Sequence, residues 1–327
     1  MGESDAAFCV WSHSSGFPQG PIGGTARVLR GSRSPILTRQ GGAMGGHGAV
    51  LAAGRRHSVA IRPDGTVLAV GDNRAGECEV GHWGDVVAVA AGNVHTAANT
   101  GKSHTVGLRA DGTVLATGWG DDRQCDVHEW RDVISVAAGW RRTLGLTANG
   151  TVLATGRTAD GACEVRAWRE IVAVTCGDWH SVGVRADGSA IAAGNNERGQ
   201  CAVENWRDLT ASSAGYLHTV GLRRDGRVVA VGSGAAGACD IESWEDIVAV
   251  DAGSHHTVGI NALGRVVAVG DNSHGQCDVG SWQRIVAVAA GSTHTLGLRA
   301  DGTVISTGNS ADGRRDVGSW SGPGCAN

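Results

Sequence analysis

The stretch GSTHTLGLRADGTVISTG occupies residues 291–308, and close copies of it begin at Gly253, Gly215 and Gly177. Its two apolar runs are rich in Val, Ile, Leu and Thr, a composition typical of β-strands. Between them lies an Asp-Gly step, whose glycine accepts the positive φ that a tight turn imposes. The stretch therefore predicts a β-hairpin, and its recurrence indicates a repeat protein.

The repeat has a strict period. Copies of the turn and the strand after it begin at residues 111, 149, 187, 225, 263 and 301, which are successive steps of 38 residues. An earlier copy begins at residue 64, which is 47 residues before 111, so 47 minus 38 leaves a nine-residue insertion at 93–101. One tryptophan recurs with each unit: Trp83, Trp130, Trp168, Trp206, Trp244, Trp282 and Trp320. Seven units are present, and a period of this length is typical of propellers, solenoids and arrays.

Each unit contains several short strand patterns. In the last unit we predict strands at 285–291, 294–300 and 303–308, and a shorter fourth strand at 275–279 in the unit before it. No 3.6-residue periodicity indicates helices. The prediction is therefore an all-β, seven-bladed β-propeller built from 38-residue repeats. An open ring would expose strand edges, so we expect the strand at 50–53 to lie beside the last unit, near residues 304–307 or Val317.

The first part of the chain lacks the repeat. Residues 1–43 show no repeat phasing, and the only methionines are Met1 and Met44. We expect residues 1–43 to be a disordered tail or to precede a true translation start at Met44. The propeller, with its insertion at 93–101, is then expected to span residues 44–327.

Composition disfavours several classes of partner. The chain has 28 Lys and Arg against 32 Asp and Glu, a formal net charge of -4, and no basic stripe, so nucleic acid is not the expected partner. No apolar run approaches the roughly 18 residues of a membrane helix, and no export signal opens the sequence. We expect a cytoplasmic, monomeric protein without membrane partners.

The cysteines repeat as well. Six of the nine fall at one position of successive units, where equivalent residues are too far apart for a disulfide. We expect reduced, packed thiols at these positions: Cys78, Cys125, Cys163, Cys201, Cys239 and Cys277.

The segments AAGSTHTLGLRADGTVISTG (289–308) and VVAVGDNSHGQCDVGSW (266–282) resemble the regulator of chromosome condensation repeat family. The short units are similar to those of its bacterial and alpha-tubulin-suppressor-like members. The resemblance implies a seven-bladed propeller. Functions in the family include nucleotide exchange on a small GTPase, plant ultraviolet-B reception and inhibition of β-lactamases, and the fold does not choose among them.

The recurring histidine does not indicate catalysis. An active site needs one asymmetric set of groups, whereas this residue returns in six of seven units and is replaced by Arg142 in the third. We predict a structural role for it, and packing between blades for the repeated tryptophans. The histidines are His57, His104, His180, His218, His256 and His294. We identify no catalytic residue, metal ligand or cofactor site.

Function should therefore lie where the units differ. In an antiparallel meander, the loop after the first strand and the loop after the third share one face. Aromatic and arginine residues concentrate at these loops in neighbouring units, and such residues are enriched in binding hot spots. We predict a protein-binding site formed by Trp119, Arg123, Trp140, Arg141, Trp179 and Tyr216, with Asn93, Val94, His95 and Thr96 of the insertion loop. The alternative is that these aromatics plug the central channel.

The resulting hypothesis is a non-enzymatic propeller that binds an as yet unidentified protein. Nucleotide exchange on a small GTPase is one alternative, although the insertion does not match the wedge of the exchange factor. Inhibition of an enzyme such as a β-lactamase is another, although that inhibitor is secreted. The motif GWRRT (139–143) resembles one that the ultraviolet-B receptor repeats, but it occurs once here and has Arg142 in place of His, which disfavours photoreception.

Overall fold

The structure is a computed structural model that describes residues 49–92 and 102–320. Every described residue belongs to one compact unit, residues 42–327. The predictions made for the tail at 1–43 and for the insertion at 93–101, including Asn93, Val94, His95 and Thr96, lie outside the described residues.

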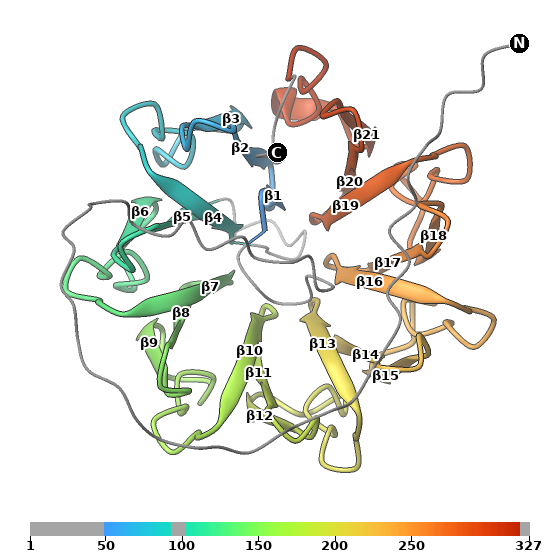
Figure 1. Ribbon diagram of the computed structural model, residues 1–327, viewed down its shortest axis with the longest axis horizontal. Coiled ribbons are helices and arrows are strands. Elements are labelled where there is room, and N and C mark those ends of the chain that lie inside the picture. Colours follow the sequence, from blue (N-terminus) through green and yellow to red (C-terminus); the bar gives the residue numbers. More distant parts are fainter. Residues whose placement is uncertain (1–48, 93–101, 321–327) are drawn as a thin grey trace, which may run out of the picture. The chain divides into compact units, whose positions relative to one another are not determined.

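Seven antiparallel sheets of three strands form a ring, which confirms the seven-bladed propeller (Figure 1). In every sheet the strands pair in chain order, so each blade has an inner, a middle and an outer strand. The inner strands of blades 1 to 7 are β1 (Leu51–Ala53), β4 (Val86–Ala91), β7 (Val133–Gly139), β10 (Ile171–Cys176), β13 (Leu209–Ala214), β16 (Ile247–Ala252) and β19 (Ile285–Ala290). The middle strands are β2 (His57–Ile61), β5 (His104–Arg109), β8 (Arg142–Thr147), β11 (His180–Arg185), β14 (His218–Arg223), β17 (His256–Asn261) and β20 (His294–Arg299). The outer strands are β3 (Val67–Gly71), β6 (Val114–Gly118), β9 (Val152–Gly156), β12 (Ala190–Gly194), β15 (Val228–Gly232), β18 (Val266–Gly270) and β21 (Val304–Gly308).

The predicted hairpin turn is present in the quoted stretch. Gly302 has a φ of 81°, and its N–H donates to the carbonyl of Arg299 at 2.9 Å. The carboxylate of Asp301 accepts the backbone N–H and the hydroxyl of Thr303, which closes the turn from its other side. The Asp-Gly step therefore acts through backbone geometry and a local side-chain cap.

The prediction of a fourth strand is wrong. Residues 275–279 form consecutive turns, in which the Asp278 N–H donates to Gly275 and the Val279 N–H donates to Cys277. Gly275 has a φ of 81°, which is incompatible with an extended strand. The short 3₁₀ segment η1 (Ala311–Gly313) occupies part of the corresponding region of the last blade.

Tryptophan and glycine of neighbouring blades pack together, which confirms the predicted role of the indoles. A Cβ atom added at Gly297 of β20 would lie only 2.7 Å from the Trp282 ring, so the indole rests directly on the glycine backbone. The same contact recurs from Trp83 on Gly107 to Trp244 on Gly259. In blade 1 an alanine, Ala60, replaces this glycine and shares one core cluster with Trp320.

The ring closes by packing between blades 7 and 1. Leu51 and Ala53 of β1 lie in one buried cluster with Val304 and Val317 of the last unit. Across the same junction, the Ser292 N–H donates to the carbonyl of Gly54 at 3.3 Å. The expected position of the first strand beside the last unit is thus confirmed.

Candidate functional site

The repeated histidines form a circular hydrogen-bond relay. In each case Nε2 lies 2.7–3.1 Å from the hydroxyl of Thr or Ser in the next blade, as in His256 with Thr295. That hydroxyl donates in turn to a backbone carbonyl, as Thr295 does to Gln276 at 2.7 Å. His294 and Ser58 form the link between the last blade and the first. The histidine is therefore structural, as predicted, and its partner belongs to the neighbouring blade.

The imidazoles of the relay donate from Nε2, and burial keeps them neutral. Because each hydroxyl gives its single hydrogen to a carbonyl, the facing Nε2 must be the donor of the shared bond. These histidines are almost completely buried. Burial lowers the pKa of His57 and His256 to about 4, and that of His104, His180 and His218 to about 3.

Arg142 replaces the histidine in blade 3 and makes more contacts than an imidazole could. Its Nε donates to the hydroxyl of Ser181 at 3.1 Å. Its terminal nitrogens donate to the carbonyls of Gly177, Asp178 and His180 in blade 4. Arg142 therefore joins blades 3 and 4 where the relay would otherwise be broken.

The repeated cysteines are free thiols, as predicted. Each sulfur lies near the backbone carbonyl six residues earlier, as in Cys277 and Asp271 at 3.4 Å. Burial raises the pKa of Cys277 and Cys201 to about 11, so these thiols stay protonated near neutral pH. Such thiols are poor nucleophiles, which supports a packing role.

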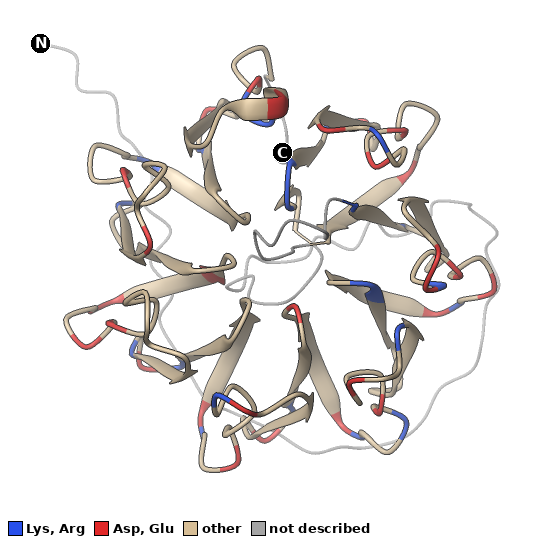
Figure 2. Ribbon diagram, turned by 180° about the vertical axis from the view of Figure 1, so that it is seen from behind, with Lys and Arg blue, Asp and Glu red and all other residues tan. Residues whose placement is uncertain are grey.

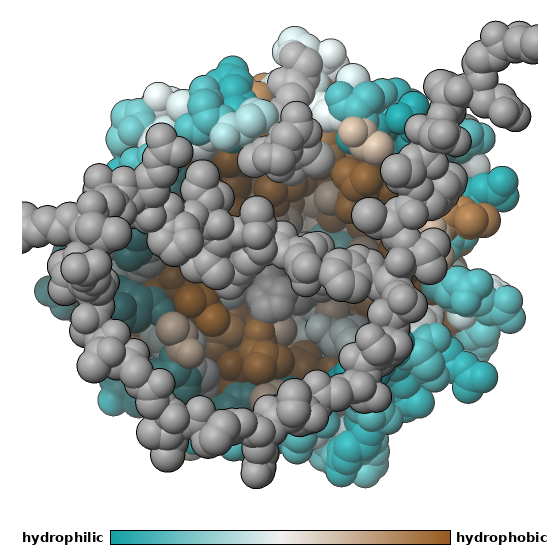
Figure 3. All heavy atoms as spheres, in the orientation of Figure 1, coloured by the Kyte–Doolittle hydropathy of each residue, from teal (hydrophilic) through white to brown (hydrophobic). Residues whose placement is uncertain are grey.

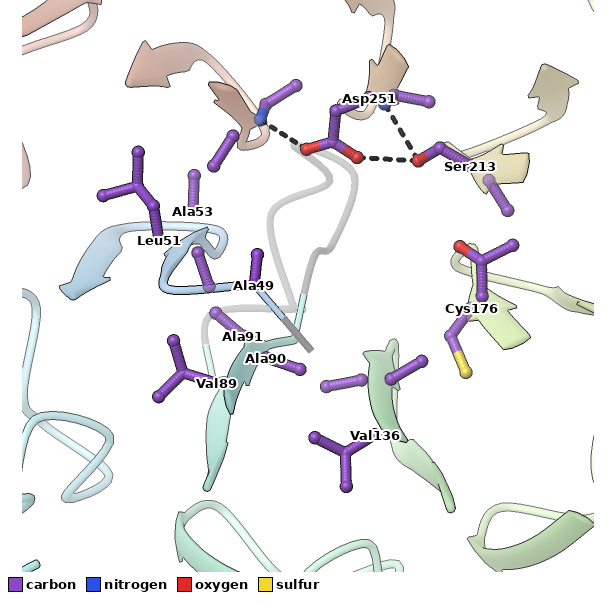
Figure 4. Close-up of a pocket in the computed structure, with 18 of the residues that line it drawn as sticks. Ala49, Leu51, Ala53, Val89, Ala90, Ala91, Val136, Cys176, Ser213 and Asp251 are labelled. Atoms are coloured by element: carbon purple, nitrogen blue, oxygen red, sulfur yellow. Dashed lines mark hydrogen bonds between the residues drawn. The ribbon is translucent and has the colours of Figure 1, made fainter. Parts of the chain in front are cut away.

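A small cavity lies where the inner strands converge, and it has a volume of about 130 Å³ (Figure 4). Most of its wall is Ala and Val, but Asp251 of β16 and Ser213 of β13 are polar. The Asp251 carboxylate accepts the hydroxyl of Ser213 at 2.7 Å and the N–H of Ala290 at 2.8 Å. Asp251 thereby joins three neighbouring blades at the inner strand edges, which is a structural role.

The predicted aromatic site is partly assembled by the fold. The Arg141 guanidinium lies between two indoles, 4.5 Å from the Trp119 ring centroid and 4.4 Å from that of Trp140. The rings of Trp140 and Trp179 meet edge to face, with centroids 4.2 Å apart. These four residues, Trp119, Trp140, Arg141 and Trp179, are called the aromatic cluster below. The cluster draws on blades 2, 3 and 4.

Two of the predicted residues, Arg123 and Tyr216, make contacts with residues outside this cluster. Arg123 is exposed, and its carbonyl accepts the hydroxyl of Thr155 at 2.8 Å. Tyr216 contacts His255 edge to face, with centroids 5.2 Å apart. Within the aromatic cluster, Trp140 is buried, with 6% of its surface exposed, whereas Trp119, Arg141 and Trp179 are half-buried.

Three charged residues that the site prediction did not include lie beside the aromatic cluster. Asp122 forms an ion pair with Arg141 at 3.3 Å, and Arg157 lies 5.6 Å from the Trp140 centroid. The Lys102 ammonium lies 5.7 Å from the centroid of Trp119. Arg157 and Trp119 occupy the same place after the outer strands of blades 3 and 2, so the loop comparison could have identified Arg157.

The turn that carries the cluster has an unusual backbone. Trp140 and Arg141 form a two-residue connection between β7 and β8, whose ends pair at Gly139 and Arg142. Arg141 has a φ of 61°, a left-handed conformation that few non-glycine residues adopt. Such a conformation persists only when surrounding contacts hold it, and here the two indoles and Asp122 do so.

Charge is distributed without a single dominant sign. Acidic and basic segments are intermixed around the outer turns (Figure 2). Among residues 49–92 and 102–320, no group of three or more His, Cys, Asp or Glu side chains is arranged to hold a metal ion. None of the helical segments in the same residues has the length and apolarity needed to span a membrane.

Comparison with known proteins identifies the repeat. The family model described as the regulator of chromosome condensation (RCC1) repeat matches residues 51–77, 133–162, 171–200, 247–276 and 285–314. Among curated protein sequences, none matches the chain at a significant level.

Several solved propellers share the fold. Human WBSCR16 has 18% identity and a TM-score of 0.60, with 76% of this chain and 85% of that chain covered. Prp20p from Saccharomyces cerevisiae, whose structure was described with its binding to Gsp1p and histones, has 16% identity and a TM-score of 0.58, with coverages of 74% and 80%. The CRINKLY WD40 ectodomain of the Arabidopsis thaliana receptor kinase ACR4 has 21% identity and a TM-score of 0.55, with coverages of 68% and 85%. At these identities the similarity establishes the fold alone.

Proposed function

The chain belongs to the regulator of chromosome condensation repeat proteins, and from this premise we propose that it is a non-enzymatic propeller that binds a partner protein through the aromatic cluster. The observation that carries the proposal is the stacking of Arg141 between Trp119 and Trp140, together with the edge-to-face contact of Trp140 with Trp179. Blades 6 and 7 place small polar residues, Ser254 and Ser292, at the position of Trp140.

The physical basis is a preorganised hot spot. Tryptophan and arginine contribute most of the binding energy at many protein interfaces, because they bury large areas around a few anchors. The Arg141 ion pair and the two cation–π contacts hold the guanidinium in place before a partner arrives. Rigid strands on either side of the turn lower the conformational entropy lost on binding.

Affinity capture with the full chain tests this function. The double variant Arg141→Ala, Trp179→Ala removes two half-buried members and leaves the buried Trp140 in place. We expect each specific partner to bind this variant about 30-fold more weakly, the equivalent of one hot spot of about 2 kcal/mol. Leu263→Ala is the control, since Leu263 is 76% exposed and lies in the turn between β17 and β18, at the other end of the strands. Equal recovery of every partner by the wild type and both variants would reject the proposed site.

Nucleotide exchange on a small GTPase is the alternative function. Its support is the fold shared with Prp20p, which binds Gsp1p. Release of fluorescent GDP from candidate GTPases distinguishes the two functions. If the double variant accelerates GDP release as the wild type does, exchange through another surface is favoured. If GDP release is not accelerated at high protein concentration, exchange on the GTPases tested is rejected.

A further inference from the structure

A second surface lies at the opposite end of the strands from the aromatic cluster. A groove of about 700 Å³ is lined there by the beginnings of inner strands β13 and β16 and the ends of middle strands β11 and β14. Val172 and Val248 form apolar parts of its wall and are 43% and 42% exposed. Thr210 also lines the groove, and its hydroxyl donates to the Leu222 carbonyl at 3.2 Å. Hydrophobic surface gathers over the inner strands, inside a more hydrophilic rim (Figure 3).

Three arginines line this groove: Arg185, Arg223 and Arg224. Within the described part of the chain none of them forms an ion pair, and the buried Nε of Arg223 has no hydrogen-bond partner. A buried guanidinium nitrogen without an acceptor is costly, so an acceptor that reaches Arg223 would be favoured.

Two carboxylates, Asp225 and Asp246, line the same groove. Asp225 is already engaged, since it accepts the backbone N–H of Arg227 at 3.1 Å and lies 4.0 Å from the Arg227 side chain. The lining therefore holds three arginines against two carboxylates, Asp225 and Asp246, and Asp225 is also paired with Arg227. The groove carries a net positive charge although the whole chain has a formal net charge of -4.

Blade 5 departs from the repeat at this surface. Arg224 occupies the place after the middle strand where the other blades have proline or alanine, namely Pro63, Ala110, Ala148, Ala186, Ala262 and Ala300. Thr210 similarly replaces the exposed Val or Ile found at the second position of the inner strand: Val87, Ile134, Val172, Val248 and Val286. The residues that the blades share maintain the ring. The two residues by which blade 5 differs, Arg224 and Thr210, therefore indicate a role specific to this blade.

We propose that the groove binds an acidic, extended segment of a partner protein. Carboxylates of the segment would pair with Arg185, Arg223 and Arg224, whose planar guanidinium groups match a carboxylate with two parallel hydrogen bonds. One apolar side chain of the segment would pack between Val172 and Val248. This site is separate from the aromatic cluster, so either can fail without the other.

Fluorescence anisotropy with the full chain and labelled peptides tests the groove. The probe is a peptide of six glutamates around one central leucine, compared with peptides in which Gln replaces Glu or Ser replaces Leu. We expect the Gln peptide to bind at least about tenfold more weakly and the Ser peptide about fivefold more weakly. The variant Arg223→Gln, Arg224→Gln should lose about tenfold or more in affinity for the Glu peptide.

Arg299→Gln provides the matched control, because Arg299 ends β20 as Arg223 ends β14 but lies outside the groove. Melting curves establish that both variants remain folded. Unchanged affinity of Arg299→Gln alongside the loss in the double variant supports the site. Equal binding of the Glu and Gln peptides would overturn the proposal, because it would show no specific charge attraction. Equal losses of affinity in the two variants would also overturn it, because they would show only diffuse charge attraction.

Discussion

At the scale of single residues, this propeller depends on glycines that make room for a neighbour. In every blade except the third, which has Arg142 instead of histidine, the glycine at the end of the inner strand lies against the imidazole that opens the middle strand. At Gly253, an added Cβ would lie 2.4 Å from His256 Cε1 and 2.3 Å from the carbonyl oxygen of Gly291 in the next blade. One of these atoms is backbone, so it cannot move aside at low cost. The recurrence of this glycine is therefore a packing requirement.

The first prediction concerns that contact. Gly253→Ala should destabilise the protein by about 3 kcal/mol, because it overpacks a buried site beside a member of the histidine relay. Gly280→Ala is the matched control, since nothing lies within 4 Å of its added Cβ and its φ is not positive. Urea unfolding monitored by circular dichroism measures both free energies. Similar unfolding midpoints for the two variants would show that the structure accommodates the methyl group at residue 253.

At the scale of elements, the critical one is the short strand β1. It pairs with β2 inside blade 1, and its Leu51 and Ala53 pack against Val304 and Val317 of the last unit. A strand of three residues thus contributes to two blades that lie at opposite ends of the described sequence. Its removal would expose the edge of β2 and open the packing at the junction.

Truncation provides the second prediction. Deleting residues 1–54 removes β1 and should lower the melting temperature of the whole ring, since neighbouring blades share their cores. Deleting residues 1–43 leaves β1 intact, and we expect it to melt close to the full chain. Differential scanning calorimetry compares the three proteins. If both truncations melt like the full chain, β1 does not hold the ring closed.

At the scale of the whole molecule, the histidine relay makes stability dependent on pH. The six imidazoles are neutral when folded, and burial holds their pKa below the ordinary value of about 6.5. Below that pH the unfolded chain binds more protons than the folded one, so stability falls as the pH falls from about 6.5 towards 4. Above pH 6.5 both states carry neutral histidines and this contribution is flat.

The third prediction follows from the relay. The melting temperature should change little between pH 7 and 8 and fall steeply between pH 6.5 and about 4, with each histidine contributing up to about 1.4 kcal/mol per pH unit. Calorimetry at pH 5 in buffers of different ionisation enthalpy measures proton uptake on unfolding, which should approach one proton for each of the six histidines. A melting temperature independent of pH over this window, with no proton uptake, would contradict the buried neutral state.

The sequence by itself was sufficient to predict the seven-bladed ring, the hairpin turns and the strands of each unit, because strand propensity, Asp-Gly turns and a 38-residue period are encoded by residues close together in the chain. The same local patterns misidentified residues 275–279 as a strand, since the positive φ of Gly275 emerges only within the folded turn.

Tertiary structure decided which side chains contact one another across the blades. His256 bonds to Thr295, 39 residues away, because blade stacking brings them together. Arg141 lies between Trp119 and Trp140 because loops of two blades meet, and the arginine groove exists because three blades supply its walls.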